Sequence, residues 1–214
     1  MEKNKLGGYP LIKSKQFAVR YVYGNREPHY KSVLKTLNTS YGTNQEASRL
    51  LNNILGEGIF EYPKPSTLIK YLIRVVYGNK NITVLDFFAG SGTTGHAVME
   101  LNEEDGGNRQ FILCTNNEVS EEKEREYLAE QGYIEKPQKR LYNKFKKEQP
   151  EQYEAFLNSE DYQALGIARS VTRERLKRVI DGYITLKGKE VEGLVNNKVK
   201  HYIIERNWSR WIIF

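Results

Sequence analysis

The spacing of hydrophobic and polar residues along the chain predicts an α/β fold. Apolar residues recur every three to four positions in three segments, as in amphipathic helices; these are 47–55, 66–77 and 172–180. Two short apolar runs, 82–88 and 111–115, are typical of strands buried in a parallel sheet. A helical stretch at 96–101 lies between the two runs. Together they predict one βαβ unit with two adjacent, parallel strands.

The remaining segments are predicted from turn and capping residues. Ser120 precedes two glutamates, which favours a capped first turn of a helix that reaches about Gln131. Residues 136–170 are expected to be helical, with interruptions at prolines. Residues 1–45 favour short strands and turns, and 200–205 is the clearest strand of the C-terminal tail.

Composition indicates one folded domain. The 214 residues are 39% hydrophobic, 12% aromatic and 28% charged, which is enough apolar content for a core. No apolar run approaches the length of a bilayer, and the N-terminal residues are polar, so we expect a cytoplasmic protein without a membrane segment. The net charge of +6 is compatible with a polyanionic partner. The single cysteine, Cys114, is expected to be a buried thiol, and the three scattered histidines lack metal-ligand spacing.

A glycine-rich loop follows the first predicted strand directly. Gly90, Gly92 and Gly95 fit the pattern G-x-G-x-x-G between a strand and a helix, where residues without Cβ let a ligand approach the backbone N–H groups. Glu118 lies just past the second predicted strand, where a carboxylate can accept hydrogen bonds from a ribose diol. These features predict an adenosine-containing cofactor but leave a nicotinamide dinucleotide and S-adenosylmethionine as alternatives. A turn without a ligand and a plain surface carboxylate also remain open.

The residues around this loop resemble one protein family. Residues 84–94, Val-Leu-Asp-Phe-Phe-Ala-Gly-Ser-Gly-Thr-Thr, are similar to the cofactor motif of DNA amino-methyltransferases, whose core Phe-x-Gly-x-Gly is here Phe88, Gly90 and Gly92. Upstream, residues 60–65, Phe-Glu-Tyr-Pro-Lys-Pro, resemble the Lys-Pro motif of that family. A Lys-Pro motif before the glycine loop is the order of the β class. The resemblance is closest to the modification subunits of type III restriction-modification systems and covers most of the chain from about Thr36.

The resemblance implies a partial Rossmann-like methyltransferase fold that binds S-adenosylmethionine. It places 88–94 and Lys64-Pro65 around the methionine moiety, Glu118 at the ribose and Val119 near the adenine. The implied cofactor-binding residues are Lys64, Pro65, Asp86, Phe88, Ala89, Gly90, Ser91, Gly92, Thr93, Thr94, Glu118 and Val119. The implied regions are a remnant of the target-recognition region with a connector over 1–58, a cofactor-binding region over 59–135 and a region of helices and strands that packs on it over 136–214.

One motif of the family is absent from the chain. These enzymes carry an Asp-Pro-Pro-Tyr type tetrapeptide that binds the target amine and stacks on the flipped base. All six prolines here are isolated, and in the permuted order the tetrapeptide would precede residue 1. We therefore expect no catalytic side chain and no metal in this chain, because the methyl group of the cofactor is already activated.

The resemblance therefore implies the cofactor-binding C-terminal portion of a DNA methyltransferase. Adenine N6, and not cytosine N4, follows only from the likeness to type III subunits. Implied partners are DNA, a complementary N-terminal segment or second subunit, and a restriction subunit. Two alternatives remain: a non-catalytic DNA- or subunit-binding remnant, and a nicotinamide-dependent oxidoreductase.

Overall fold

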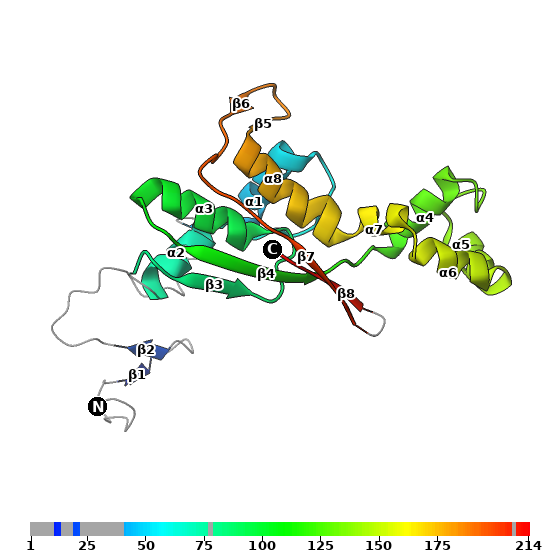
Figure 1. Cartoon of the computed structure of the whole chain (residues 1–214), viewed down its shortest axis with the longest axis horizontal. Helices are drawn as coiled ribbons and strands as arrows, with labels where there is room; N and C mark the ends of the chain where they lie inside the picture. Colours follow the sequence, from blue (N-terminus) through cyan, green and yellow to red (C-terminus); the bar gives the residue numbers. More distant parts are fainter. Residues whose placement is uncertain (1–10, 14–18, 22–40, 77–78, 207–208) are drawn as a thin grey trace.

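Two parallel strands and the helix between them lie at the centre of the chain (Figure 1). The computed structural model describes residues 11–13, 19–21, 41–76, 79–206 and 209–214. Strand β3 (Thr83–Asp86) pairs in parallel with β4 (Gln110–Asn116), and α3 (Thr93–Asp105) connects them. The pairing confirms the predicted βαβ unit. Helix α3 begins three residues before the predicted stretch, directly after the glycine loop.

The C-terminal strands complete the sheet on the other side of β4. Strands β7 (Tyr202–Arg206) and β8 (Ser209–Ile213) form an antiparallel hairpin, and β8 pairs antiparallel with the last residues of β4. The order is β3-β4-β8-β7, so β3 is at one edge of the described sheet. Strand β7 confirms the strand predicted near residues 200–205. Its connection to β4 through β8 had no signal in the local pattern.

Amphipathic helices cover this sheet. Helices α1 (Asn44–Leu55) and α2 (Ser66–Val76) confirm two of the segments that the hydrophobic spacing predicted. Thr43 and Glu46 form a capping box, which explains why α1 begins three residues before its apolar pattern. The predicted last residue of α2, Tyr77, lies outside the described residues.

Helical structure at the third predicted amphipathic segment, 172–180, begins four residues earlier than expected, at Ala168. Helix α8 (Glu174–Asp181) follows without a break from a π-helical segment, Ala168–Arg173. The main core lies between four parts of the structure: this helical segment with α8, helix α1, helix α3 and the sheet. Its buried residues are Leu51, Ile54, Leu55, Ala89, Met99, Leu113, Ala168, Val171, Leu176, Val179, Ile212 and Phe214.

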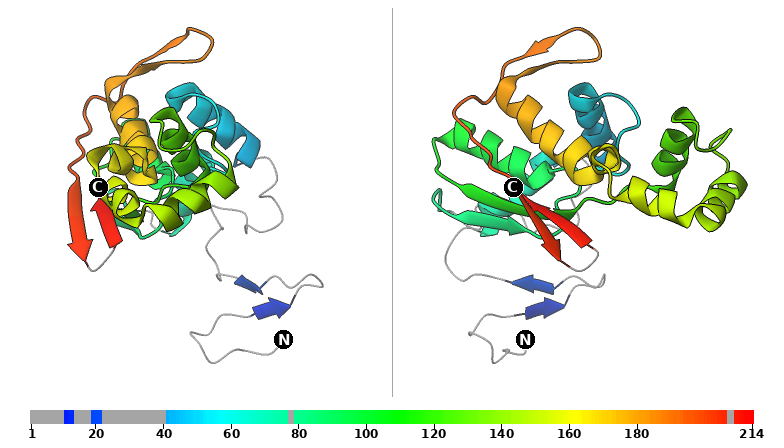
Figure 2. Two further views of the ribbon diagram at one scale, coloured as in Figure 1. Left: turned by 90° about the vertical axis from the view of Figure 1, so that its right-hand side faces the viewer. Right: turned by 45° about the vertical axis from the view of Figure 1, so that its right-hand side comes forward.

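Four helices form a separate lobe that extends from one side of the main body (Figure 2). They are α4 (Glu121–Glu130), α5 (Lys139–Glu148), α6 (Pro150–Leu157) and α7 (Glu160–Leu165). These bounds confirm the predicted helical character of this part of the chain, and the Ser120 side chain caps α4 as expected. The lobe has its own core, made by Leu128, Ile134, Tyr142, Phe145 and Phe156. The predicted regional bounds at 58 and 135 stay a prediction.

Two short hairpins form two-stranded sheets apart from the main sheet. Strands β1 (Leu11–Lys13) and β2 (Val19–Tyr21) pair antiparallel, as do β5 (Tyr183–Ile184) and β6 (Glu190–Val191). Most of the expected target-recognition remnant lies outside the described residues.

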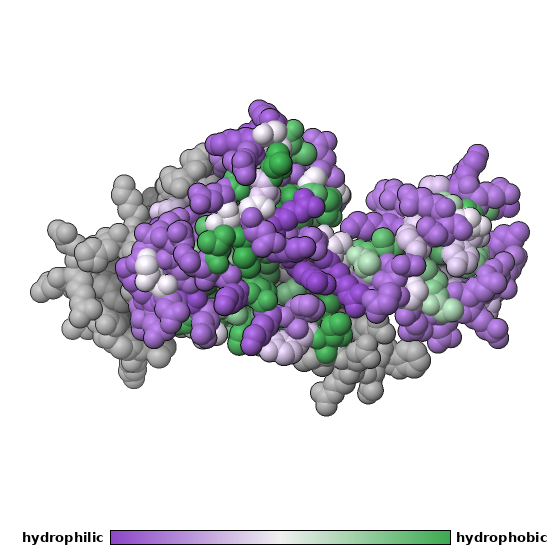
Figure 3. Space-filling view, turned by 45° about the horizontal axis from the view of Figure 1, so that its top comes forward, coloured by the Kyte–Doolittle hydropathy of each residue, from purple (hydrophilic) through white to green (hydrophobic). Residues whose placement is uncertain are grey.

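Hydrophilic side chains cover much of the face in Figure 3, and hydrophobic ones gather near the middle of the larger body. None of the described helices combines the length and the apolar character that crossing a bilayer requires.

Candidate functional site

The loop between β3 and α3 is shaped by hydrogen bonds of its own residues. Asp86 ends β3, and its two carboxylate oxygens accept hydrogen bonds from the Phe88 N–H at 2.9 Å and from the Thr94 hydroxyl at 2.6 Å. The Gly92 N–H donates to the Ala89 carbonyl at 2.7 Å, which closes the turn. The Asp86 side chain therefore bonds to both ends of the loop.

The glycines of the loop are required by backbone conformation and by close packing. Gly90 and Gly92 have φ values of 50° and 74°, in the left-handed region that favours glycine. A Cβ at Gly92 would lie 3.2 Å from Cγ2 of Thr172. A Cβ at Gly95 would lie 2.8 Å from Cδ2 of Leu176, so Gly95 lets α3 pack closely on α8. The G-x-G-x-x-G pattern thus positions the loop and also the helix that follows.

The Lys-Pro segment lies beside this loop. The Thr93 hydroxyl donates a hydrogen bond of 3.3 Å to the backbone carbonyl of Lys64. The Phe60 ring also faces the loop, because a Cβ at Gly90 would lie 3.4 Å from its Cζ atom. Pro65 is buried, whereas Lys64 is exposed. The structure therefore brings together the two sequence segments that were predicted to form one site.

Glu118 follows the second strand of the parallel pair. The carboxyl ends of β3 and β4 meet at the same edge of the sheet because the two strands are parallel. The Glu118 carboxylate is exposed and accepts a hydrogen bond of 3.4 Å from the Asn116 side chain, while its backbone carbonyl accepts one of 3.0 Å from Ile167 N–H. Val119 next to it is half-buried. The expected contacts of Glu118 and Val119 with ribose and adenine stay predictions.

Two polar residues that the sequence analysis did not identify, Thr172 and Arg175, form hydrogen bonds with the glycine loop. Thr172 donates a hydrogen bond of 2.6 Å to the Gly90 carbonyl. Arg175 donates to Ser91 and Thr93, and both Thr172 and Arg175 are almost completely buried. A signal was present, since Arg175 lies four residues before Val179 and thus on the apolar face of the predicted helix.

Burial determines the charge states beside the loop. The Arg175 Nε–H donates to His96 Nδ1 at 3.3 Å, and His96 Nε2 lies 3.4 Å from a Glu100 carboxylate oxygen. Burial, followed by the charges of Arg175 and Lys70, holds the pKa of His96 well below its ordinary value. Burial also lowers the pKa of Arg175 to about 10. At neutral pH, Arg175 is therefore a cation and His96 is neutral, with Nδ1 as acceptor and Nε2 carrying the proton.

The remaining candidate chemistry is limited. Cys114, expected to be buried, is partly buried in β4, and its carbonyl accepts a hydrogen bond from the Ala89 N–H. In the part of the chain that the structure describes, no three His, Cys, Asp or Glu residues gather as metal ligands would. The site thus consists of backbone groups, hydroxyls and carboxylates around a turn, an arrangement suited to binding a polar small molecule.

Comparison with known proteins gives a family match over more than half of the chain. A family model described as DNA methylase matches residues 9–131. The chain is 53% identical to the StyLTI Mod subunit of a type III restriction-modification enzyme from Salmonella typhimurium strain LT2, over 73 residues that make up 34% of this chain and 11% of that protein.

Two further relatives match longer stretches. The EcoPI Mod subunit of Escherichia phage P1, also of a type III restriction-modification enzyme, is 44% identical over 102 residues, which are 47% of this chain and 16% of the relative. The type II methyltransferase M.KpnI of Klebsiella pneumoniae is 36% identical over 110 residues, 51% of this chain and 26% of the relative. The chain thus spans at most about a quarter of these proteins.

Proposed function

We propose that this chain, which belongs to the DNA methylase family, is the S-adenosylmethionine-binding portion of a site-specific DNA methyltransferase. The whole enzyme would be part of a restriction-modification system. The target would be the N6 atom of adenine, in line with the likeness to type III modification subunits. The fold would be a partial Rossmann-like methyltransferase fold, in which the cofactor binds at the carboxyl ends of the parallel strands β3 and β4.

The observation that carries the proposal is the hydrogen bond between the two cofactor motifs. Thr93 in the glycine loop donates to the backbone of Lys64, although 29 residues separate them. The resulting site lies after the C-terminal end of β3, at the edge where open α/β sheets bind their ligands. In the proposed site, loop residues 88–94 and Lys64-Pro65 would enclose the methionine moiety. Glu118 would accept hydrogen bonds from the ribose hydroxyls, and Val119 would contact the adenine.

The residues of the chain would bind and orient, and would not react. When bound, S-adenosylmethionine would supply an activated sulfonium methyl group for transfer to the amine nitrogen. A fixed loop contributes by aligning this group with its acceptor, and positioning is a large part of catalysis in such a transfer. The amine-binding tetrapeptide is absent from the 214 residues, so we propose that it comes from another segment or subunit.

An exposed apolar strand edge supports the proposed partner. Strand β3 is the edge strand of the described sheet, and Leu85 is 51% exposed. Phe87 and Phe88, which follow β3, are 59% and 86% exposed. Exposed strand edges and apolar side chains are places where another chain segment binds. We propose that the complementary N-terminal segment or second subunit, which carries the tetrapeptide, covers this edge.

DNA and a restriction subunit are two further partners in the proposal. DNA is the proposed substrate because the chain belongs to a DNA methylase family and carries a net charge of +6. A restriction subunit is a proposed partner because two relatives are Mod subunits of restriction-modification enzymes.

Titration calorimetry of the purified chain tests the cofactor assignment. We expect S-adenosylmethionine and S-adenosylhomocysteine to bind with one-to-one stoichiometry and NAD not to bind. Binding of NAD in place of S-adenosylmethionine would favour the oxidoreductase alternative. Binding of none of the three would favour a non-catalytic remnant and overturn the proposal.

A further inference from the structure

A charged side chain is buried directly beneath the glycine loop. Arg175, from α8, is 1% exposed, and its Nη1 donates hydrogen bonds to the Ser91 carbonyl at 3.2 Å, the Ser91 hydroxyl at 3.1 Å and the Thr93 hydroxyl at 2.8 Å. Thr93 in turn donates to the Lys64 carbonyl. One guanidinium group therefore bonds to the loop directly and to the Lys-Pro segment through a single hydroxyl.

Thr172, three residues before Arg175, bonds to the loop at Gly90, the residue before Ser91. Thr172 lies in the π-helical segment before α8, and its hydroxyl donates to the Gly90 carbonyl at 2.6 Å. Its Cγ2 atom lies against Gly92, as the 3.2 Å approach of a Cβ there shows. Consecutive carbonyls of the loop, those of Gly90 and Ser91, thus accept hydrogen bonds from one helix. These two hydrogen bonds restrict the backbone conformation of the loop.

Packing alone does not account for an arginine at this position. Its hydrogen-bond partners among the described residues are neutral hydroxyls, a carbonyl and the neutral His96 imidazole. Burying a cation costs free energy that an apolar side chain of similar length would avoid. What the guanidinium adds is several N–H donors in a rigid, planar arrangement. The arginine thus provides directed hydrogen bonds at the place where the loop turns.

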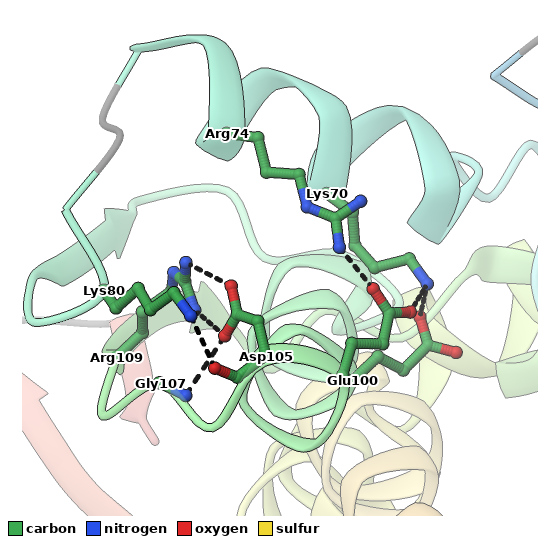
Figure 4. Close-up of polar contacts among 8 residues, drawn as sticks. Lys70, Arg74, Lys80, Glu100, Asp105, Gly107 and Arg109 are labelled. Carbon is green, nitrogen blue, oxygen red and sulfur yellow. Dashed lines mark hydrogen bonds and ion pairs between the residues drawn. The ribbon is translucent and has the colours of Figure 1, made fainter.

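A chain of polar contacts orients the guanidinium group from its other side. His96 accepts from Arg175 and approaches Glu100, and the Glu100 carboxylate lies 3.1 Å from Lys70 Nζ. Figure 4 shows Lys70 reaching from α2 to the carboxylates of α3. Lys70 also pairs with Glu104 at 2.6 Å. The orientation of Arg175 is therefore coupled to the packing of α2 on α3.

We propose that Arg175 and Thr172 are positioning residues for the cofactor: they fix the carbonyls of the glycine loop so that its backbone is preorganised for S-adenosylmethionine. This inference rests on the proposed function, because it assumes that the loop binds the cofactor. A preorganised loop loses less conformational freedom on binding, so its contribution appears as affinity.

The test compares cofactor affinity and stability across four variants of the chain. Arg175→Met removes the donors and the charge but keeps an unbranched, flexible side chain, and Arg175→Lys restores the charge and some donors. Thr172→Val removes one hydroxyl with little change of shape. Arg178→Met is the matched control, since Arg178 lies on the same helix and donates to a backbone carbonyl of Ile54, in α1.

We expect Arg175→Met to weaken binding of S-adenosylhomocysteine about ten-fold or more, Thr172→Val about three-fold or more, and Arg175→Lys less than Arg175→Met. Arg178→Met should lower the melting temperature without changing affinity. Affinity is measured by calorimetry at a temperature where circular dichroism shows each variant to be folded.

The outcomes separate this inference from the proposed function. If the unmodified chain does not bind the cofactor, both the proposed function and the positioning role fail. If it binds but Thr172→Val and the folded Arg175 variants bind equally well, only the positioning role is overturned. If Arg175→Met does not fold, Thr172→Val and Arg175→Lys decide the result: unchanged affinity in both overturns the inference, and weakened binding in Thr172→Val supports it.

Discussion

The hydroxyl of Thr94 donates a hydrogen bond of 2.6 Å to Oδ2 of Asp86, which joins the end of β3 to the first turn of α3. The other carboxylate oxygen of Asp86 accepts from the Phe88 N–H at 2.9 Å. Both oxygens thus bond to the loop itself. Asp86, which the family resemblance placed among the cofactor contacts, therefore has a role in shaping the loop whether or not it contacts the ligand.

Asp86→Asn should destabilise the chain and weaken cofactor binding together. An asparagine has one carbonyl oxygen and cannot accept both hydrogen bonds as a carboxylate does. We expect the free energy of unfolding in urea to fall by about 1–2 kcal/mol. Asp181→Asn, at the exposed end of α8, is the control and should change neither quantity. Equal stability of the two variants would contradict the loop-shaping role.

Alanine at Gly92 should affect cofactor binding, whereas alanine at Gly106 should not. Both glycines flank α3 with left-handed φ values, 74° and 64°. Each substitution should therefore lower the free energy of unfolding by about 1 kcal/mol. Only a Cβ at Gly92 meets a neighbour, Thr172, so only this variant moves the loop. Calorimetry should show weaker binding for Gly92→Ala alone, and equal affinities would mean that the loop is only a turn.

Glu118→Gln tests the assigned ribose contact. A charged acceptor contributes more to a hydrogen bond than a neutral one, so the proposed site predicts a loss of affinity of about ten-fold. The fold should be unaffected, because the Glu118 carboxylate is exposed. Glu122→Gln, in the first turn of α4, is the matched control. An affinity for S-adenosylhomocysteine that is the same in both variants would remove the ribose assignment.

The stability of the chain should decrease as the pH falls below about 6.5. Burial and the nearby charges of Arg175 and Lys70 lower the pKa of His96 in the folded protein, despite the adjacent Glu100. In this pH range the unfolded chain therefore binds the proton more readily, which disfavours folding by up to about 1.4 kcal/mol per pH unit.

Urea unfolding between pH 5.5 and 7.5 measures this effect. The carboxyl groups of Glu104 and Asp105 have lowered pKa values, so their contributions are lost only at more acidic pH and do not overlap the window. His96→Gln should flatten the dependence. A wild-type stability that does not fall from pH 7.5 to 5.5 would contradict a buried, neutral His96.

The chain alone should transfer no methyl groups to DNA. No Pro-Pro pair occurs in the 214 residues, so the amine-binding tetrapeptide must be added in trans. Mixing the chain with an N-terminal segment that carries Asp-Pro-Pro-Tyr should allow incorporation of labelled methyl groups, and Gly92→Ala should reduce it. Robust incorporation by the chain alone would overturn the proposed division of the site between two segments.

The sequence by itself determined the central unit and the residues that form its loop. The apolar runs of β3 and β4, the glycines between them and the capping residue Ser120 act over a few positions, so local spacing was enough to predict them. The lobe helices were predicted for the same reason. The family resemblance added S-adenosylmethionine as the expected cofactor, a choice that spacing alone left open.

Only the tertiary structure decided what lies beneath and beside that loop. Arg175 bonds to Ser91 across 84 residues of sequence, and Thr172 bonds to Gly90 across 82. The antiparallel pairing of β8 with β4 likewise joins distant segments, such as Ile213 and Cys114. Such contacts produce no periodic pattern of residues in the sequence, because their geometry depends on how α8 and the C-terminal strands pack on the core. For the Arg175 contacts alone, a local sign existed: an arginine on the apolar face of the predicted helix.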